Sequence, residues 1–307
     1  MKTKYRNALT ALPALLCAVM LMTACTKAEL DDDFTEGDPP PIGAYTNSSE
    51  VAPADLVAYF PFDGSVADAK GGVTGGTISG GGGFTAGKKG QAYQGAANAF
   101  IAYANSGPIG TLTSFTVSMW INTNRHQGGA QGVFTVTKAD GSFWGNFFML
   151  IEGAGPNDKM LVKVHFEKNV AGVSNVEHWL ETTGKIRENF MADMYGGWRH
   201  IAFTYNEATS KFAMYVNGTK LPFNDPTVPR NDEDRFASAG VPLGPLSFKS
   251  PARFVIGGFQ NQLGAPYNNP EPWMLPYTGK LDELRFYKKA LTDQEINALF
   301  QLEKQGR

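Results

Sequence analysis

Cysteine is scarce in this chain of 307 residues. Its two cysteines, Cys17 and Cys25, both lie near the N-terminus, and none follows them. A segment without further cysteine can form no internal disulfide, even in an oxidising compartment. The rest of the chain must therefore be stabilised by a hydrophobic core, with or without a bound metal.

Clusters of positive charge are missing as well. The chain has 27 Lys and Arg residues against 29 Asp and Glu residues. Proteins that bind nucleic acid neutralise its phosphates with clustered cations, and the sequence has no such cluster. Nucleic acid is therefore not expected as a partner.

Only one apolar stretch is long, and it lies at the N-terminus. Three basic residues among the first six precede an apolar run over residues 8–22, which closes on small residues before Cys25. This layout is typical of a secretory signal. The closing Leu-Met-Thr-Ala-Cys also resembles the lipobox of bacterial lipoproteins. That resemblance implies that residues 1–24 are removed and that Cys25 carries diacylglycerol and fatty acid, such as palmitate, which anchor the protein in a membrane.

The segment after the lipobox is polar. Residues 25–54 are rich in Asp, Glu, Pro, Ser and Asn and show no apolar period, so we expect a disordered tether. Its acidic beginning resembles the export signal of lipoproteins in Bacteroidota-like bacteria. The resemblance implies an outer-membrane lipoprotein that faces outward from the cell surface. The alternative is a solvated tether whose charge only keeps it extended.

Residues 55–307 are predicted to form one domain. Short apolar runs alternate with period two, and one of them ends at Asn217-Gly218, a strong hairpin signal. Such runs predict an all-β fold with two stacked antiparallel sheets. A capping box over residues 292–295 predicts a short C-terminal helix, and a second helix is expected within residues 186–194. Strands are expected at 56–60, 94–103, 115–121, 133–138, 147–152, 162–167, 178–182, 201–205, 212–216, 253–259 and 281–287.

Four stretches carry a family resemblance. They are LVAYFPFDG at 56–64, FTVSMWIN at 115–122, WRHIAFTY at 198–205 with FAMYVNGT at 212–219, and GKLDELRFY at 279–287 followed by ALTDQEI at 290–296. In this order they resemble the laminin-G-like, or concanavalin A-like, jelly-roll superfamily of lectins and glucanases. The resemblance implies a two-sheet jelly-roll sandwich. Three insertions depart from the family, and their roles are not carried over: residues 170–196, 222–250 and 260–277.

Three carboxylates are candidate calcium ligands. Period two places Asp282 on the core face with Leu284 and Phe286, where a carboxylate is costly unless it is paired or metal-bound. The family resemblance implies one structural Ca²⁺ where the closing strand meets the loop after the first strand, and that loop contains Asp63 and Asp68. Calcium takes about six to eight oxygen ligands, which this mixed set would supply. The alternative is a set of hydrogen bonds between Asp282 and amides of the loop.

No catalytic set is recognised. The glucanases of this superfamily carry carboxylates on one face of a strand, which requires a spacing of i, i+2 or i, i+4. The chain has no such triplet, and no nucleophile motif accompanies its four histidines. We therefore expect a protein that is not an enzyme. The alternative is a polysaccharide hydrolase with an unrecognised catalytic set that includes Glu152 or Glu167.

A binding role agrees better with the sequence. Sugars stack on exposed aromatic rings, and binding sites favour loops and concave sheet faces. The leading expectation is a lectin-like domain that binds a glycan or another extracellular polymer; an adhesion or scaffold role with a protein partner, such as an outer-membrane protein, is the alternative. Each candidate ring has a second interpretation, in which it packs an insertion down, and the polar candidates have one as a solvated sheet face. The candidates are Trp144, Lys163, His165, Glu167, His178, Trp179, Tyr267 and Trp273.

Overall fold

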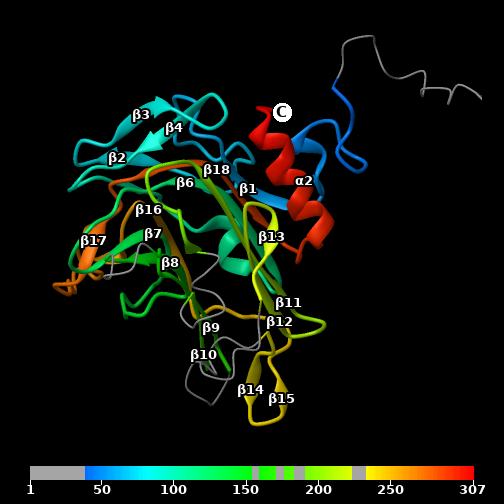
Figure 1. Ribbon diagram of the computed structural model, residues 1–307. Coiled ribbons are helices and arrows are strands. Elements are labelled where there is room, and N and C mark those ends of the chain that lie inside the picture. Colours follow the sequence, from blue (N-terminus) through cyan, green and yellow to red (C-terminus); the bar gives the residue numbers. More distant parts are fainter. Residues whose placement is uncertain (1–38, 154–158, 171–175, 183–190, 223–232) are drawn as a thin grey trace, which may run out of the picture. The chain divides into compact units, whose positions relative to one another are not determined.

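A computed structural model describes residues 39–307, apart from 154–158, 171–175, 183–190 and 223–232 (Figure 1). Residues 41–307 form one compact unit. In this described part, no helix has both the length and the apolar character needed to cross a membrane. The signal segment and Cys25 lie outside the described residues, and so does most of the helix expected within 186–194.

The alternating runs form two eight-stranded sheets, as the sequence predicts. In each sheet, seven strands pair along one path and an eighth strand pairs beside that path. In sheet I the eighth strand is β1 (Leu56–Phe60), which pairs antiparallel with β18 (Lys280–Tyr287), and in sheet II it is β17 (Met274–Pro276), which pairs parallel with β7 (Ala130–Lys138). A separate hairpin joins β14 (Phe236–Ser238) to β15 (Val241–Pro242). The order in sheet I is β13 (Thr219–Lys220), β12 (Lys211–Val216), β11 (Arg199–Asn206), β6 (Phe115–Asn122), β18 (Lys280–Tyr287), β4 (Gln91–Gln94) and β3 (Gly83–Ala86), with β1 (Leu56–Phe60). The order in sheet II is β10 (Val176–Glu181), β9 (Val162–Lys168), β8 (Phe147–Glu152), β7 (Ala130–Lys138), β16 (Pro251–Ile256), β5 (Phe100–Ala102) and β2 (Thr77–Ser79), with β17 (Met274–Pro276).

One expected strand, over residues 94–103, is two strands. β4 ends at Gln94 in sheet I, and β5 begins at Phe100 in sheet II, so the chain crosses between the sheets here. Gly95 makes the crossing possible, because a Cβ at this position would lie 1.8 Å from the carbonyl oxygen of Tyr277. Alternation of buried residues is found after this glycine, over residues 99–103, and the sequence analysis did not predict the change of sheet.

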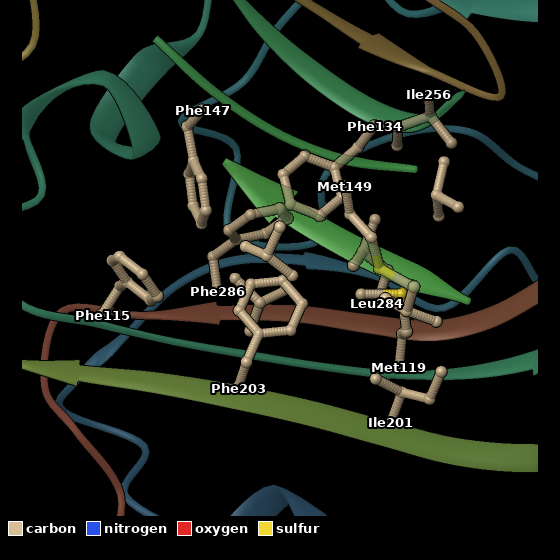
Figure 2. Packing of buried hydrophobic residues seen from close by; sticks show 14 of the residues in the cluster. Phe115, Met119, Phe134, Phe147, Met149, Ile201, Phe203, Ile256, Leu284 and Phe286 are labelled. Carbon is tan, nitrogen blue, oxygen red and sulfur yellow. The ribbon is translucent and has the colours of Figure 1, made fainter. Parts of the chain in front are cut away.

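The core lies between the two sheets and is rich in aromatic rings (Figure 2). Phe115 of β6 meets Phe147 of β8 with ring centroids 4.7 Å apart, and Phe134 of β7 meets Phe286 of β18 at 5.4 Å. Each of these four rings is fully buried, which contributes on the order of 2–3 kcal/mol per side chain from removal of apolar surface from water. This burial holds the domain together without a disulfide.

Helix α2 (Asp293–Lys304) covers the outer face of sheet I. Thr292 caps it and forms the predicted capping box with Glu295. Its buried residues Ile296, Leu299 and Leu302 pack in one cluster with side chains from the sheet, and the rings of Tyr215 and Tyr287 are among these. The helix therefore closes this face of the sandwich.

The folded unit begins earlier than predicted. The sequence assigns residues 25–54 to a tether, but Ile42, Tyr45 and Val51 pack into the cluster beneath α2. A short 3-10 helix, η1 (Ser48–Glu50), is capped by Asn47. Polar composition favoured a tether here, and a few apolar residues suffice to bind the segment to the domain. Two further 3-10 helices are η2 (Gly107–Thr111) and η5 (Gln260–Leu263).

Candidate functional site

A row of aromatic side chains crosses the outer face of sheet II. Phe148 of β8 lies opposite His165 of β9, which lies opposite Trp179 of β10. Directly opposed residues project on the same side of a sheet, so the three rings meet. The ring centroids of Phe148 and His165 are 4.7 Å apart and nearly parallel, and those of His165 and Trp179 are 4.4 Å apart.

Two loops bring more rings onto this row. The loop between β7 and β8 supplies Phe143 and Trp144, and the segment before β17 supplies Trp273. Trp144 lies 5.1 Å from Trp179, with the rings nearly perpendicular, and 5.8 Å from Trp273. Phe148 is buried, whereas Phe143, Trp144, Trp179 and Trp273 are only half-buried. These five residues form what we call the aromatic patch.

Charged side chains border the aromatic patch. The ammonium of Lys163 lies 2.7 Å from a carboxylate oxygen of Glu152 and 3.9 Å from one of Glu181. Glu177 accepts a hydrogen bond of 3.4 Å from Nε1 of Trp179, which holds its carboxylate at the edge of that ring. These four residues form the rim of the patch, and they offer hydrogen-bonding groups beside half-buried rings.

A buried polar group supports the rings from below. Glu167 forms an ion pair of 2.6 Å with Lys138 and lies 3.2 Å from Nε2 of His165. Desolvation is the main cause that lowers the pKa of His165, and the nearby Glu167 opposes it. His165 is therefore neutral at pH 7 and acts as a flat, buried support between Phe148 and Trp179.

The structure brings six of the predicted ligand-binding residues together. Trp144, Trp179 and Trp273 belong to the aromatic patch, and Lys163 to its rim. His165 and Glu167 lie at the same place, but they are 0% and 1% exposed and so support the patch from beneath.

Two predicted ligand-binding residues lie elsewhere. His178 stacks on Phe166 on the opposite, inner side of sheet II, with ring centroids 5.3 Å apart. Burial there lowers the pKa of His178 to about 3. Tyr267 is only 7% exposed, and its backbone N–H donates to the carbonyl of Gly264 within its own loop. Neither side chain presents a free surface to a ligand.

Phe143 and Phe148 are patch residues that the sequence analysis missed. The sequence of β8, Phe-Phe-Met-Leu-Ile-Glu, has apolar residues at both alternating sets of positions. Such a strand is covered on both faces. The apolar residues on both faces of β8 could have identified Phe148 as a covered outward residue. The approach of Phe143 to Trp273 depends on two loops that are far apart in the sequence.

Residues 94–241 match the concanavalin A-like lectin/glucanases superfamily. No curated protein matches the sequence. Among solved structures, domain 4 of AbnA, an extracellular GH43 arabinanase from Geobacillus stearothermophilus in complex with arabinotriose, aligns with a TM-score of 0.50 and 19% identity, over 80% of this chain and 98% of that domain. The binding domain of botulinum neurotoxin DC in complex with rat synaptotagmin II aligns with a TM-score of 0.52 and 13% identity, over 82% of this chain but 52% of that domain. At these identities the likeness concerns the fold alone, and this chain spans about half the length of the toxin domain.

In the described part of the chain, the three predicted calcium ligands do not lie in a group of three or more His, Cys, Asp or Glu side chains that could hold a metal ion. Asp68 accepts four backbone N–H groups, two at each oxygen, from Tyr59, Lys70, Gly72 and Val73, at 2.8 to 2.9 Å. A carboxylate has about four acceptor positions, and all of them are used by donors. Asp68 therefore organises its own loop and does not fit the role of a calcium ligand.

Asp282 also accepts backbone amides. Its Oδ2 accepts N–H groups of Lys88 and Lys89 at 2.7 and 3.0 Å, and its Oδ1 accepts that of Glu283 at 2.8 Å. Asp63 accepts the N–H of Gln91 at 2.7 Å, so both carboxylates hold the turn between β3 and β4. This donor pattern agrees with the hydrogen-bonding alternative, and calcium at these residues stays a prediction that the geometry does not favour.

The prediction that the Asp282 side chain projects from the core face of the sheet is wrong. Asp282 lies opposite Trp120, which projects from the outer face of sheet I, and not on the core face with Leu284. The register of β18 shifts between Asp282 and Arg285, and Glu283 has a φ of 51°. Such a β-bulge reverses the alternation of side chains, so period two cannot be extended across it. Burial raises the pKa of Asp282 to about 7, and the amides of Lys88 and Lys89 oppose that rise.

A Ser–His pair occurs on sheet I, but it lacks the third group of a triad. Oγ of Ser118 lies 2.8 Å from Nε2 of His200, and both residues are fully buried. Within the described residues, Nδ1 of His200 has no hydrogen-bond partner, so no carboxylate orients the ring. Burial lowers the pKa of His200 to about 3. The pair is a structural contact beneath Phe300 of α2.

Proposed function

We propose that this protein binds a glycan at the aromatic patch and holds it without cleaving it. The observation that carries the proposal is the meeting of four half-buried aromatic rings, from three separate segments, with hydrogen-bonding groups at their border. Half-buried rings in contact with one another leave apolar faces that a ligand can cover. The C–H faces of a sugar ring stack on such surfaces, while its hydroxyls bond with charged groups beside them.

The arrangement of carboxylates favours binding over hydrolysis. A glycosidase needs one carboxylic acid with a raised pKa and a second carboxylate at a set distance. Glu167 is buried and paired with Lys138 and His165, so it reaches no ligand. Glu152 forms an ion pair of 2.7 Å with Lys163, so its carboxylate is engaged by a cation of the protein.

Affinity electrophoresis of the purified protein through gels that contain single polysaccharides tests the proposal. Arabinan belongs in the panel, because the AbnA domain of similar fold was in complex with arabinotriose. We expect at least one polysaccharide to retard the protein, and Trp179→Ala to weaken that binding by about 2 kcal/mol, roughly thirtyfold in Kd. The matched control is Phe236→Ala, which removes a ring that is 47% exposed but lies on the separate hairpin. Binding that survives Trp179→Ala, or release of reducing ends, would contradict the proposal; capture of a protein partner alone would support the adhesion role instead.

We also propose that a lipid on Cys25 anchors the protein in the outer membrane, with the domain facing outward. The support is the sequence pattern of residues 1–25 and the acidic segment that follows. Labelling of cells with radioactive palmitate should mark the wild-type protein and not Cys25→Ser. Protease added to intact cells should remove the domain if it faces outward. A protected domain would place it on the inner leaflet.

A further inference from the structure

The charge around the aromatic patch bears on the kind of glycan that would bind there. Glu177 is exposed on the rim, and Glu271 is exposed two residues before Trp273. The rim cation, Lys163, is already paired with Glu152 at 2.7 Å. A ligand that covers the patch therefore approaches exposed carboxylates, and the rim ammonium that it meets is engaged with a protein carboxylate.

Within the described residues, two further cations that contacts place near the patch are paired too. Lys138 is only 5% exposed and forms its ion pair with Glu167 beneath His165. Lys249 is paired at 2.9 Å with Asp140, at the start of the loop that carries Trp144. An anionic group that loses water on binding needs a cation or several donors in return. Neither lysine has an uncompensated charge to offer.

Glu177 has a specific place in this arrangement. Nε1 of Trp179 donates to Oε2 of Glu177, so the carboxylate stands at the edge of a half-buried ring. A sugar that stacks on Trp179 would direct its equatorial substituents toward this edge. Hydroxyl groups would donate to Glu177, whereas a carboxylate or sulfate at the same position would lie beside a like charge.

We infer that the aromatic patch takes an uncharged glycan and discriminates against glycans that carry carboxylate or sulfate groups, with Glu177 as the main specificity-determining residue. This inference rests on the proposed glycan binding. The carboxylate of Glu177 can accept hydrogen bonds from the hydroxyls of a neutral sugar. A carboxylate on the ligand, about 4 Å from Glu177 in water, would instead repel it and weaken binding by about fivefold.

A matched pair of polymers tests the inference. The neutral polysaccharide that binds most tightly is compared with its own derivative in which primary hydroxyls are oxidised to carboxylates, and the panel includes polygalacturonate and chondroitin sulfate. At 50 mM NaCl we expect the oxidised derivative to bind about fivefold more weakly than its neutral parent. The difference should shrink at 500 mM NaCl, because salt screens exposed charges.

Two variants assign the effect to its residue. Glu177→Gln keeps an oxygen that accepts the indole N–H and removes the charge, so the ratio of the two affinities should move toward one. Asp55→Asn removes a charge that precedes β1 of sheet I, and it should leave the ratio unchanged. A polyanion as the tightest ligand, or an oxidised derivative that binds as well as its parent, would overturn the inference and leave glycan binding intact. No binding by any polymer would contradict the proposed function itself.

Discussion

The outer faces of the two sheets differ in what covers them. On sheet I, helix α2 and residues 42–51 cover the outward side chains, so Tyr215 and Tyr287 are 2% and 0% exposed. On sheet II, two loops cover the outward side chains only in part, and Trp144, Trp179 and Trp273 stay half-buried. An apolar sheet face that the described elements cover only in part is a candidate surface for another molecule. The comparison therefore separates a structural face from the proposed binding face in one domain.

The ion pairs on the two faces also differ in how deeply they are buried. On sheet I, Arg285 lies between Glu283 and Glu303, with Nε 3.0 Å from the carboxylate of Glu303. The indole of Trp120 donates to the same carboxylate at 2.7 Å, and all of these groups are sealed from solvent. On sheet II the ion pair of Lys163 with Glu152 is partly exposed. Charges of the first kind are buried and depend on their partners, and charges of the second kind are paired but partly exposed to solvent.

The largest expected effect concerns the buried charge on sheet I. Arg285→Leu leaves Glu283 and Glu303 buried without their cation, so we expect the free energy of unfolding to fall by about 3–5 kcal/mol. Urea denaturation measures this. The matched control is Lys163→Met on sheet II, which breaks a partly exposed pair and should change stability by at most about 1 kcal/mol. Equal losses in the two variants would contradict the distinction between the faces.

The next prediction concerns the pH dependence of stability, to which His178 on the inner side of β10 contributes. His178 is buried on the inner side, and its pKa is about 3, below the unfolded value near 6.5. The unfolded chain therefore takes up the proton first, and stability is lost as the pH falls from about 6.5 toward 3. His178→Phe keeps the stacking on Phe166 and removes the titration. Relative to the variant, the wild type should lose about 1.4 kcal/mol per pH unit in this window.

The measurement is the free energy of unfolding of both proteins at pH 7, 6, 5 and 4. Parallel pH profiles would show that His178 is accessible to water in the folded state. A difference in polysaccharide binding between the two proteins at pH 7 would return His178 to the ligand site. We expect no such difference, because its ring faces the core.

The smallest expected effect is that of a chelator. The carboxylates of Asp68 and Asp282 are engaged by backbone amides, so EDTA should shift the Tm by less than about 1 °C. A loss of about 1 kcal/mol would shift it by about 2–4 °C in a domain of this size. Differential scanning calorimetry with EDTA and with added Ca²⁺ checks this. A reversible drop in Tm that is absent in Asp282→Ala would show that calcium binds there after all.

The sequence predicted the sandwich well because its signal is local. Alternation in β6, β9, β11 and β12 fixes which side chains face the core, and the capping box at Thr292 fixes the start of α2. The same alternation placed His165 and Glu167 on the outer face of sheet II. The half-buried tryptophans were candidates because the sequence places them in loop or insertion contexts, and their contact with a ligand stays a prediction.

Other features could not be predicted, since they depend on register and on distant contacts. No sequence signal around Asp282 predicts the β-bulge at Glu283, and this bulge changes the face from which the Asp282 carboxylate projects. His178 was grouped with His165, but the pairing places Trp179 opposite His165 and so turns His178 to the other face. The meeting of Trp144 with Trp273 arises only when two loops fold over the same strands.

Fluorine NMR of the protein labelled with 5-fluorotryptophan tests the central claim most directly. The five tryptophans give one signal each, and single Trp→Phe variants assign them. On addition of an oligosaccharide of the polymer that binds most tightly, we predict shifts at Trp144, Trp179 and Trp273 and an unchanged signal at Trp120, which lies beneath α2 on the other sheet. Shifts at Trp120 with unchanged signals from the three patch tryptophans would contradict the account.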